Sequence, residues 1–184
     1  MKKVGAALLA ALLVLALAGC GSKDSEEAAN EVYAEDGYGE GRMGDTMHTY
    51  FFDYTVNSAY VCGTYEGYIP ADGNELLVAE VTVKNASAQS IPMWDDDFQA
   101  QWNEEGNDDA YSWPITEDVE PVSSEQLPAE YDLAAEEERT GLLVFEVPAG
   151  NQDFSISYRE LFDNGTAEGE PGDTFFVFFT AESK

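Results

Sequence analysis

Few residues in this chain could carry out chemistry on a substrate. The sequence has two cysteines and one histidine, so a thiol activated by an imidazole would have to combine Cys62 with His48. Nothing around these two residues indicates an oxyanion hole, and Cys62 is more simply read as a small apolar residue. Paired carboxylates could hydrolyse glycosides, but acids come close by chance in a chain with 37 Asp and Glu. We therefore predict that the protein is not an enzyme.

The other cysteine, Cys20, ends a segment with the features of a bacterial lipobox. Two lysines follow Met1, an uncharged Ala/Leu-rich run extends over 4–17, and Leu17, Ala18 and Gly19 precede the cysteine. The run is shorter than the ~20 residues that cross a bilayer comfortably. Small residues before the cut fit a narrow peptidase site, and a thiol can take diacylglycerol from a phospholipid. We expect cleavage before Cys20 and stable anchoring there by two or three acyl chains.

The composition after Cys20 divides the chain. We expect a lipoprotein signal peptide over 1–19, the lipidated cysteine and a disordered acidic linker over 20–45, and a folded domain over 46–184. The linker is rich in Ser, Glu, Ala and Asn and has glycines at 37, 39 and 41 near its end. Because lipid occupies Cys20, Cys62 is left as the single thiol, and the domain must fold without an internal disulfide.

The charge of the chain limits its partners. Lys and Arg number 8 against 37 Asp and Glu, and the formal net charge is -29. This balance excludes nucleic acid as a ligand. It also keeps an exposed protein soluble and repels it from anionic lipids and wall polymers.

Two acidic clusters suggest a calcium site. Asp95, Asp96 and Asp97 precede the expected strand 98–102, and Asp108 and Asp109 follow it. Hard oxygen ligands on loops suit Ca²⁺, but no stretch matches the EF-hand loop pattern. The two clusters also fall at opposite ends of a short strand. Solvated acidic loops are therefore the favoured interpretation, with Ca²⁺ as an alternative and no other metal or cofactor expected.

Aromatic residues in or beside expected loops suggest a second kind of site. Flat rings can stack on sugars, and four candidates for such contacts are Tyr65, Tyr68, Trp94 and Trp113. The cores of β-sandwiches also consume aromatic residues, which is the favoured interpretation here.

Apolar and polar residues alternate with period two along most of the remaining chain, which indicates half-buried strands. Phe52, Tyr54 and Val56 share one face, and Phe154, Ile156 and Tyr158 alternate with polar neighbours. The segment 132–139 could be a short helix or a single turn between two strands. The count is about seven strands, which predicts an all-β antiparallel sandwich. The expected segments are 50–61, 77–83, 98–102, 111–113, 143–147, 154–158 and 174–180.

Three segments in order add a resemblance to a known family. They are Phe52-Asp-Tyr-Thr-Val-Asn-Ser-Ala59, Leu77-Val-Ala-Glu-Val-Thr-Val-Lys-Asn85 and Thr140-Gly-Leu-Leu-Val-Phe-Glu-Val-Pro148. The region 44–180 resembles the telokin-like, immunoglobulin-like domain of unknown function in lipoproteins of Firmicutes, which is similar to mycobacterial secreted immunogenic antigens. The resemblance implies an immunoglobulin-like fold and an extracellular location, and it supplies no catalytic residues.

These observations predict a protein held by Cys20 on the outer face of the cell membrane. Its domain is expected to be a monomeric, non-enzymatic binding module for an unknown protein or envelope ligand. Two alternatives remain: an accessory or sensor subunit of a membrane partner, and a Ca²⁺-dependent carbohydrate-binding module.

Overall fold

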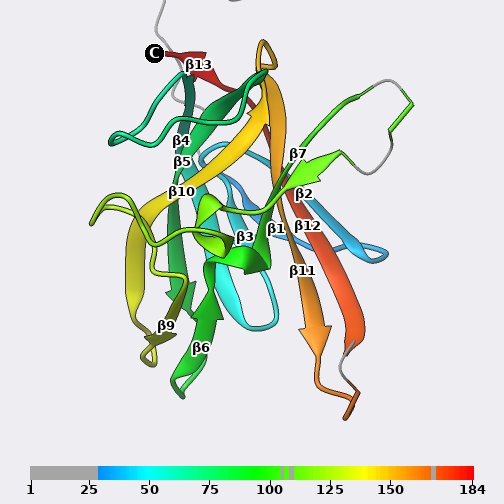
Figure 1. Cartoon of the computed structure of the whole chain (residues 1–184). Helices are drawn as coiled ribbons and strands as arrows, with labels where there is room; N and C mark the ends of the chain where they lie inside the picture. The colour runs from blue at the N-terminus through cyan, green and yellow to red at the C-terminus, as the bar shows by residue number, and fades with distance from the viewer. Residues whose placement is uncertain (1–28, 105, 108–109, 167–168) are drawn as a thin grey trace, which may run out of the picture.

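Two large β-sheets face each other across one core in the computed structural model, which describes residues 29–104, 106–107, 110–166 and 169–184 (Figure 1). The six-stranded sheet contains β1 (Glu31–Tyr33), β3 (Thr46–His48), β4 (Phe52–Cys62), β5 (Asn74–Asn85), β10 (Glu138–Pro148) and β13 (Glu182–Ser183). The five-stranded sheet has the order β2 (Tyr38–Arg42), β12 (Glu170–Thr180), β11 (Asp153–Phe162), β7 (Phe98–Trp102) and β8 (Tyr111–Ser112). A ribbon of β6 (Ile91–Trp94) and β9 (Glu130–Leu133) and two 3-10 turns, η1 (Asp95–Asp97) and η2 (Ile115–Glu117), complete the fold.

The predicted β-sandwich is confirmed, and each of the seven expected segments contains a strand, namely β4, β5, β7, β8, β10, β11 and β12. Alternate residues of β4 face the core, as the period of two predicted. Phe52, Tyr54 and Val56 are buried in the core, whereas the residues between them are partly exposed. Within the segment 132–139, residues 134–137 form a turn between β9 and β10, as the second of its two interpretations expected.

The prediction of about seven strands, all antiparallel, was too simple. The described residues contain thirteen strands, and the six additional ones are two to five residues long. They are too short to display a period, which is why the sequence did not indicate them. Three of them, β1, β2 and β13, pair in parallel with β3, β12 and β4.

The linker boundary at residue 45 was also wrong, because β1 and β2 lie inside the segment 20–45. The glycines that suggested a linker allow β2 to lie against the core. A Cβ atom added at Gly39 would be 2.5 Å from the ring of Phe175, and one added at Gly41 would be 2.7 Å from Sδ of Met47. The part of the linker at 20–28 lies outside the described residues.

A cluster of aromatic rings lies at the centre of the core between the sheets. Phe52 and Tyr54 of β4 pack against Phe98 of β7 and Tyr158 of β11, with ring centroids 4.7–6.3 Å apart. Such contacts join the two sheets at their centre.

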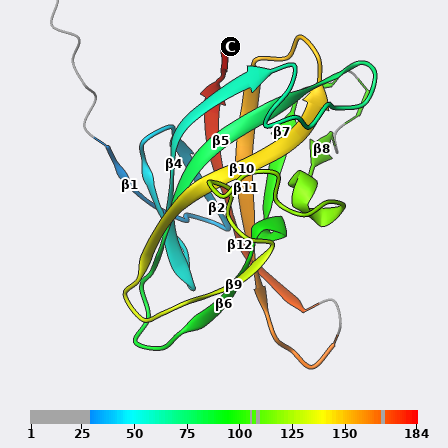
Figure 2. The same cartoon turned by 60° about the vertical axis from the view of Figure 1, so that its left-hand side comes forward.

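The outer faces of the two sheets differ. On the six-stranded sheet, Leu76, Val78 and Val144 point away from the core and are buried beneath a second cluster that includes Tyr65 and Ile115. The loops around these two residues cover that face (Figure 2). The outer face of the five-stranded sheet carries a groove, which we describe next.

Candidate functional site

The groove follows from the alternation along β11, the middle strand of its sheet. Phe154, Ile156 and Tyr158 point into the core, so Ser155 and Ser157 point outward. Strand register then places longer side chains on both sides of these serines. One row across the sheet pairs Phe178 with Ser155 and Ser155 with Gln101, and the next pairs Phe176 with Ser157 and Ser157 with Gln99.

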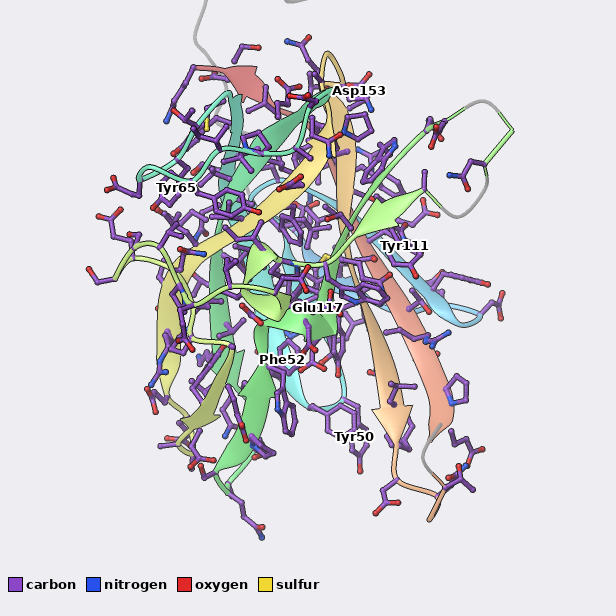
Figure 3. The ribbon with its side chains drawn as sticks, in the orientation of Figure 1. Tyr50, Phe52, Tyr65, Tyr111, Glu117 and Asp153 are labelled. Atoms are coloured by element: carbon purple, nitrogen blue, oxygen red, sulfur yellow. The ribbon has the colours of Figure 1, made fainter. Side chains whose placement is uncertain are left out.

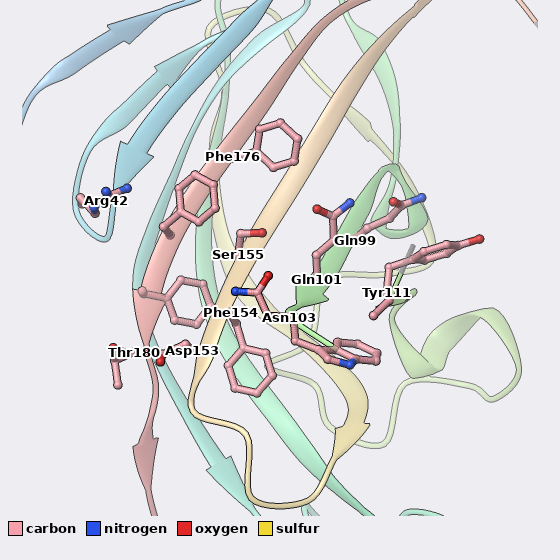
Figure 4. A pocket seen from close by; sticks show the side chains of 14 residues that line it. Arg42, Gln99, Gln101, Asn103, Tyr111, Asp153, Phe154, Ser155, Phe176 and Thr180 are labelled. Carbon is pink, nitrogen blue, oxygen red and sulfur yellow. Dashed lines mark hydrogen bonds between the residues drawn. The ribbon is translucent and has the colours of Figure 1, made fainter. Parts of the chain in front are cut away.

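The groove has a volume of about 660 Å³, because the short side chain of Ser155 lies between the longer ones of Phe178 and Gln101. Arg42 of β2 lies opposite Phe178 and closes one side, and Tyr111 of β8 lies opposite Gln101 on the other. Figure 4 shows this order, from Arg42 across Ser155 to Gln101 and Tyr111. The volume is within the ordinary range of small-molecule sites, ~300–1,000 Å³.

The aromatic wall of the groove is a stack along β12. The rings of Phe176 and Phe178 have centroids 5.9 Å apart and an interplanar angle of 18°. Tyr38 of β2 continues the stack at 6.5 Å from Phe176. The guanidinium carbon of Arg42 lies 5.3 Å from the centroid of Phe178, which is a cation–π contact.

The polar side chains of the groove are notable for their missing partners. Ser155 lines the groove and is 5% exposed, and its hydroxyl forms no side-chain hydrogen bond with the rest of the described chain. Ser157, in the next row of the sheet, also forms none. The same holds for the side-chain amides of Gln99 and Gln101. Trp102, which also lines the groove, has a buried Nε1 without a partner among the described residues. The glutamine amides are half-buried and the serine hydroxyls are not fully buried, so these groups can pair with water or with a bound molecule.

A second hollow of about 460 Å³ adjoins the groove, since Trp102 and Tyr111 line both. It brings together two of the aromatic candidates, Tyr68 and Trp113. The hydroxyl of Tyr68 donates to Oε1 of Glu146 at 2.7 Å. This bond to the carboxylate, together with burial, raises the pKa of Tyr68 to about 12.

The other two aromatic candidates lie elsewhere. Tyr65 is buried beneath the loops of the six-stranded sheet, and Figure 3 shows it far from Tyr111. Trp94 is 40% exposed on β6 and lines neither hollow. Sequence reasoning therefore found the edge of this region and missed the groove itself. The alternation along β7, β11 and β12 indicates which residues face outward. Only the register of the strands shows that these residues are neighbours.

The acidic cluster at η1 points mainly inward. Asp95 is buried and accepts a hydrogen bond from the hydroxyl of Thr116, and Asp97 accepts one from the backbone N–H of Trp94 at 3.3 Å. Burial raises the pKa of Asp95, and burial with the neighbouring charges of Asp96 and Asp95 raises that of Asp97 to about 6. Asp108 and Asp109 lie outside the described residues. In the described part of the chain, η1 included, no three His, Cys, Asp or Glu side chains are grouped to hold a metal ion.

The possible Cys–His pair does not form. Nδ1 of His48 lies 2.8 Å from Oδ1 of Asp53, and Nε2 is hydrogen-bonded to Glu31. Cys62 is at the opposite end of β4, nine residues from Asp53, which is ~30 Å along a strand. Burial also raises the pKa of the Cys62 thiol, which disfavours the nucleophilic thiolate.

The residues expected to carry the anchor, Leu17, Ala18, Gly19 and Cys20, lie outside the described residues. Among the helices of the described part, none is long and apolar enough to span a membrane.

Comparisons with known proteins give a family and a fold. No curated protein matches the sequence. The domain is similar to a functionally unknown protein from Listeria monocytogenes EGD-e, with a TM-score of 0.53 and 13% identity over 77% of this chain and 84% of that one. It is also similar to the "putative lipoprotein (ycdA)" of Bacillus subtilis subsp. subtilis str. 168, with a TM-score of 0.51 and 16% identity over 74% of this chain. The match spans only 38% of the Bacillus chain. Residues 41–167 match the domain of unknown function DUF4352, and the chain therefore belongs to that family.

Proposed function

We propose that this protein is an extracytoplasmic lipoprotein whose β-sandwich is a non-enzymatic binding module, with the groove on the five-stranded sheet as its ligand site. The observation that carries the proposal is the convergence on one groove of polar side chains that form no hydrogen bond within the described chain, namely Gln99, Gln101 and Ser155. Because these groups are open to the groove, a bound molecule can pair with them.

The anchor is supported by the sequence. Leu17-Ala18-Gly19-Cys20 after an apolar run is the pattern of lipid attachment, and one structural neighbour carries a lipoprotein name. As part of the same proposal, the domain is of the telokin-like, immunoglobulin-like kind and is similar to mycobacterial secreted immunogenic antigens.

Replacing the cysteine tests the anchor. In cells that express Cys20→Ala, the protein should leave the membrane fraction, because the acyl chains have no attachment point. A melting temperature equal to that of the unchanged chain would show that the domain is intact. If the variant partitions into membranes as before, the anchor proposal is wrong.

A binding experiment tests the groove. The fluorescently labelled full chain should bind isolated cell envelopes saturably, and the double variant Gln101→Ala/Ser155→Ala should bind less. Gln89→Ala is the matched control, since Gln89 is exposed and does not line the groove. Equal envelope binding by the groove variant and the control would overturn the assignment of the site.

A further inference from the structure

We infer that the groove binds a short, uncharged oligosaccharide without a metal ion. This inference rests on the proposed function and adds the chemical class of the ligand. It follows from three properties of the groove: its hydrogen-bonding groups, its position on the sheet and its charge.

The hydrogen-bonding groups match those of a sugar. A serine hydroxyl both donates and accepts, and a glutamine side chain has an amide donor at one position and a carbonyl acceptor at another. Gln99, Gln101, Ser155 and Ser157 bring four such groups to one surface. Sugar hydroxyls also donate and accept, so each can pair with any of the four.

The apolar part of the groove suits the same ligand. Phe176 and Phe178 form a wall along β12, and Tyr111 is 40% exposed on the other side. The C–H surfaces of a sugar ring pack against aromatic side chains while its hydroxyls meet the polar floor. Arg42, placed by Phe178, has guanidinium N–H groups beyond the one that donates to the Gly41 carbonyl at 3.1 Å.

The position of the groove argues against an extended peptide. Peptides commonly bind to sheets by adding a strand to a free edge, where backbone groups are unpaired. This groove lies over β11, which is hydrogen-bonded to β12 on one side and to β7 on the other. The regularly spaced N–H and C=O groups of a peptide would find no backbone partner here.

The charges favour a neutral ligand. Among the described residues that line the groove, Arg42 and Asp153 are the charged ones, one of each sign. The surrounding chain has a formal net charge of -29, which repels polyanions. A sugar polymer carrying carboxylates or phosphates is therefore a poor match.

Isothermal titration calorimetry on the full chain tests this inference. The neutral probes are cellotetraose, maltotetraose and chitotetraose, each taken to about 10 mM. Tetragalacturonate is the anionic counterpart, and a neutral Gly/Ser decapeptide is the peptide counterpart. All titrations are run in a chelator and repeated with Ca²⁺.

We expect at least one neutral tetrasaccharide to bind saturably, with the same affinity in chelator and in Ca²⁺. Gln101→Ala and Ser155→Ala should each weaken that binding about threefold to tenfold, the value of one or more hydrogen bonds. Gln89→Ala and Trp94→Ala, which change an amide and an indole outside the groove, should leave it unchanged. Thermal melts of all four variants check that they are folded.

Three outcomes would overturn the inference: no binding of any neutral tetrasaccharide, binding that the two groove variants leave intact, or equal or tighter binding of the anionic sugar or the peptide. The envelope experiment separates these failures from a failure of the proposed function. If envelopes bind through the groove but no neutral sugar does, the site stands and the ligand class is wrong.

Discussion

Replacement of Asp97 by Asn should stabilise the domain at neutral pH. Asp97 ends η1, where burial and the charges of Asp96 and Asp95 raise its pKa to about 6. The only hydrogen bond to its carboxylate from the described residues is the backbone N–H of Trp94, at 3.3 Å. The asparagine carbonyl can accept that bond without carrying the buried charge.

The magnitude follows from the pKa of Asp97. An aspartate in an unfolded chain titrates near 4, so the folded protein, with a pKa of about 6, binds this proton ~100-fold more tightly. That factor corresponds to about 3 kcal/mol. Because the native state holds this proton more strongly, the contribution of Asp97 to stability is most favourable below pH 4 and falls as the pH rises toward 6. Above that range the full cost of the buried charge is present, and Asp97→Asn removes it.

Urea unfolding of the full chain at about pH 4 and pH 7.5 measures this effect. The variant and the unchanged chain should differ little at the lower pH, and the variant should be more stable by about 2–3 kcal/mol at the higher one. Asp72→Asn is the control, because Asp72 is exposed and is not among the charges that raise the pKa of Asp97. A variant that is less stable at pH 7.5, or equally shifted at both pH values, would refute the argument.

Three further predictions concern the same domain. His48→Gln should cost more stability at about pH 5.5 than at about pH 9 in urea unfolding: burial opposes protonation, but hydrogen bonds to two carboxylates raise the pKa of His48, and this stabilisation is lost as the pH rises through the folded value. Gly39→Ala should cost about 1–3 kcal/mol in a thermal melt, because its Cβ would be 2.5 Å from Phe175, whereas Gly63→Ala enters open space and should cost less. Ca²⁺ should raise the melting temperature no more than Mg²⁺ at equal ionic strength, since the acids of η1 point mainly inward, and a selective rise would contradict this.

The long strands could be predicted from the sequence because apolar residues at alternate positions identify the buried face of each strand. Phe52, Tyr54 and Val56 are apolar residues at every second position of β4, and all three side chains enter the same core. The short strands had no such signal. In β2, Gly39 and Gly41 are buried because they lack side chains, so the composition suggested a linker where the structure has an edge strand.

The candidate site could not be predicted in the same way, because it depends on register. Gln101, Ser155 and Phe178 are far apart in the chain and become neighbours only through the pairing of β7, β11 and β12. The aromatic candidates were chosen for lying in loops, which found Tyr68 and Trp113 but also Tyr65, whose ring covers the other sheet. A residue's place in a loop does not say which face of the sandwich it covers.

The difference between the two outer faces has a simple origin in the central strands. On the six-stranded sheet, the outward positions of β5 are Leu76 and Val78, so that face must be covered, and the loops carrying Tyr65 and Ile115 cover it. On the five-stranded sheet, the outward positions at the middle of β11 are Ser155 and Ser157, which need no apolar cover, and Ser155 leaves room between its longer neighbours. If the serines are there to leave the face open for a ligand, replacing Ser155 by a leucine should fill the groove and abolish binding while preserving the sandwich. Retained binding in a folded Ser155→Leu protein would mean that the ligand lies elsewhere.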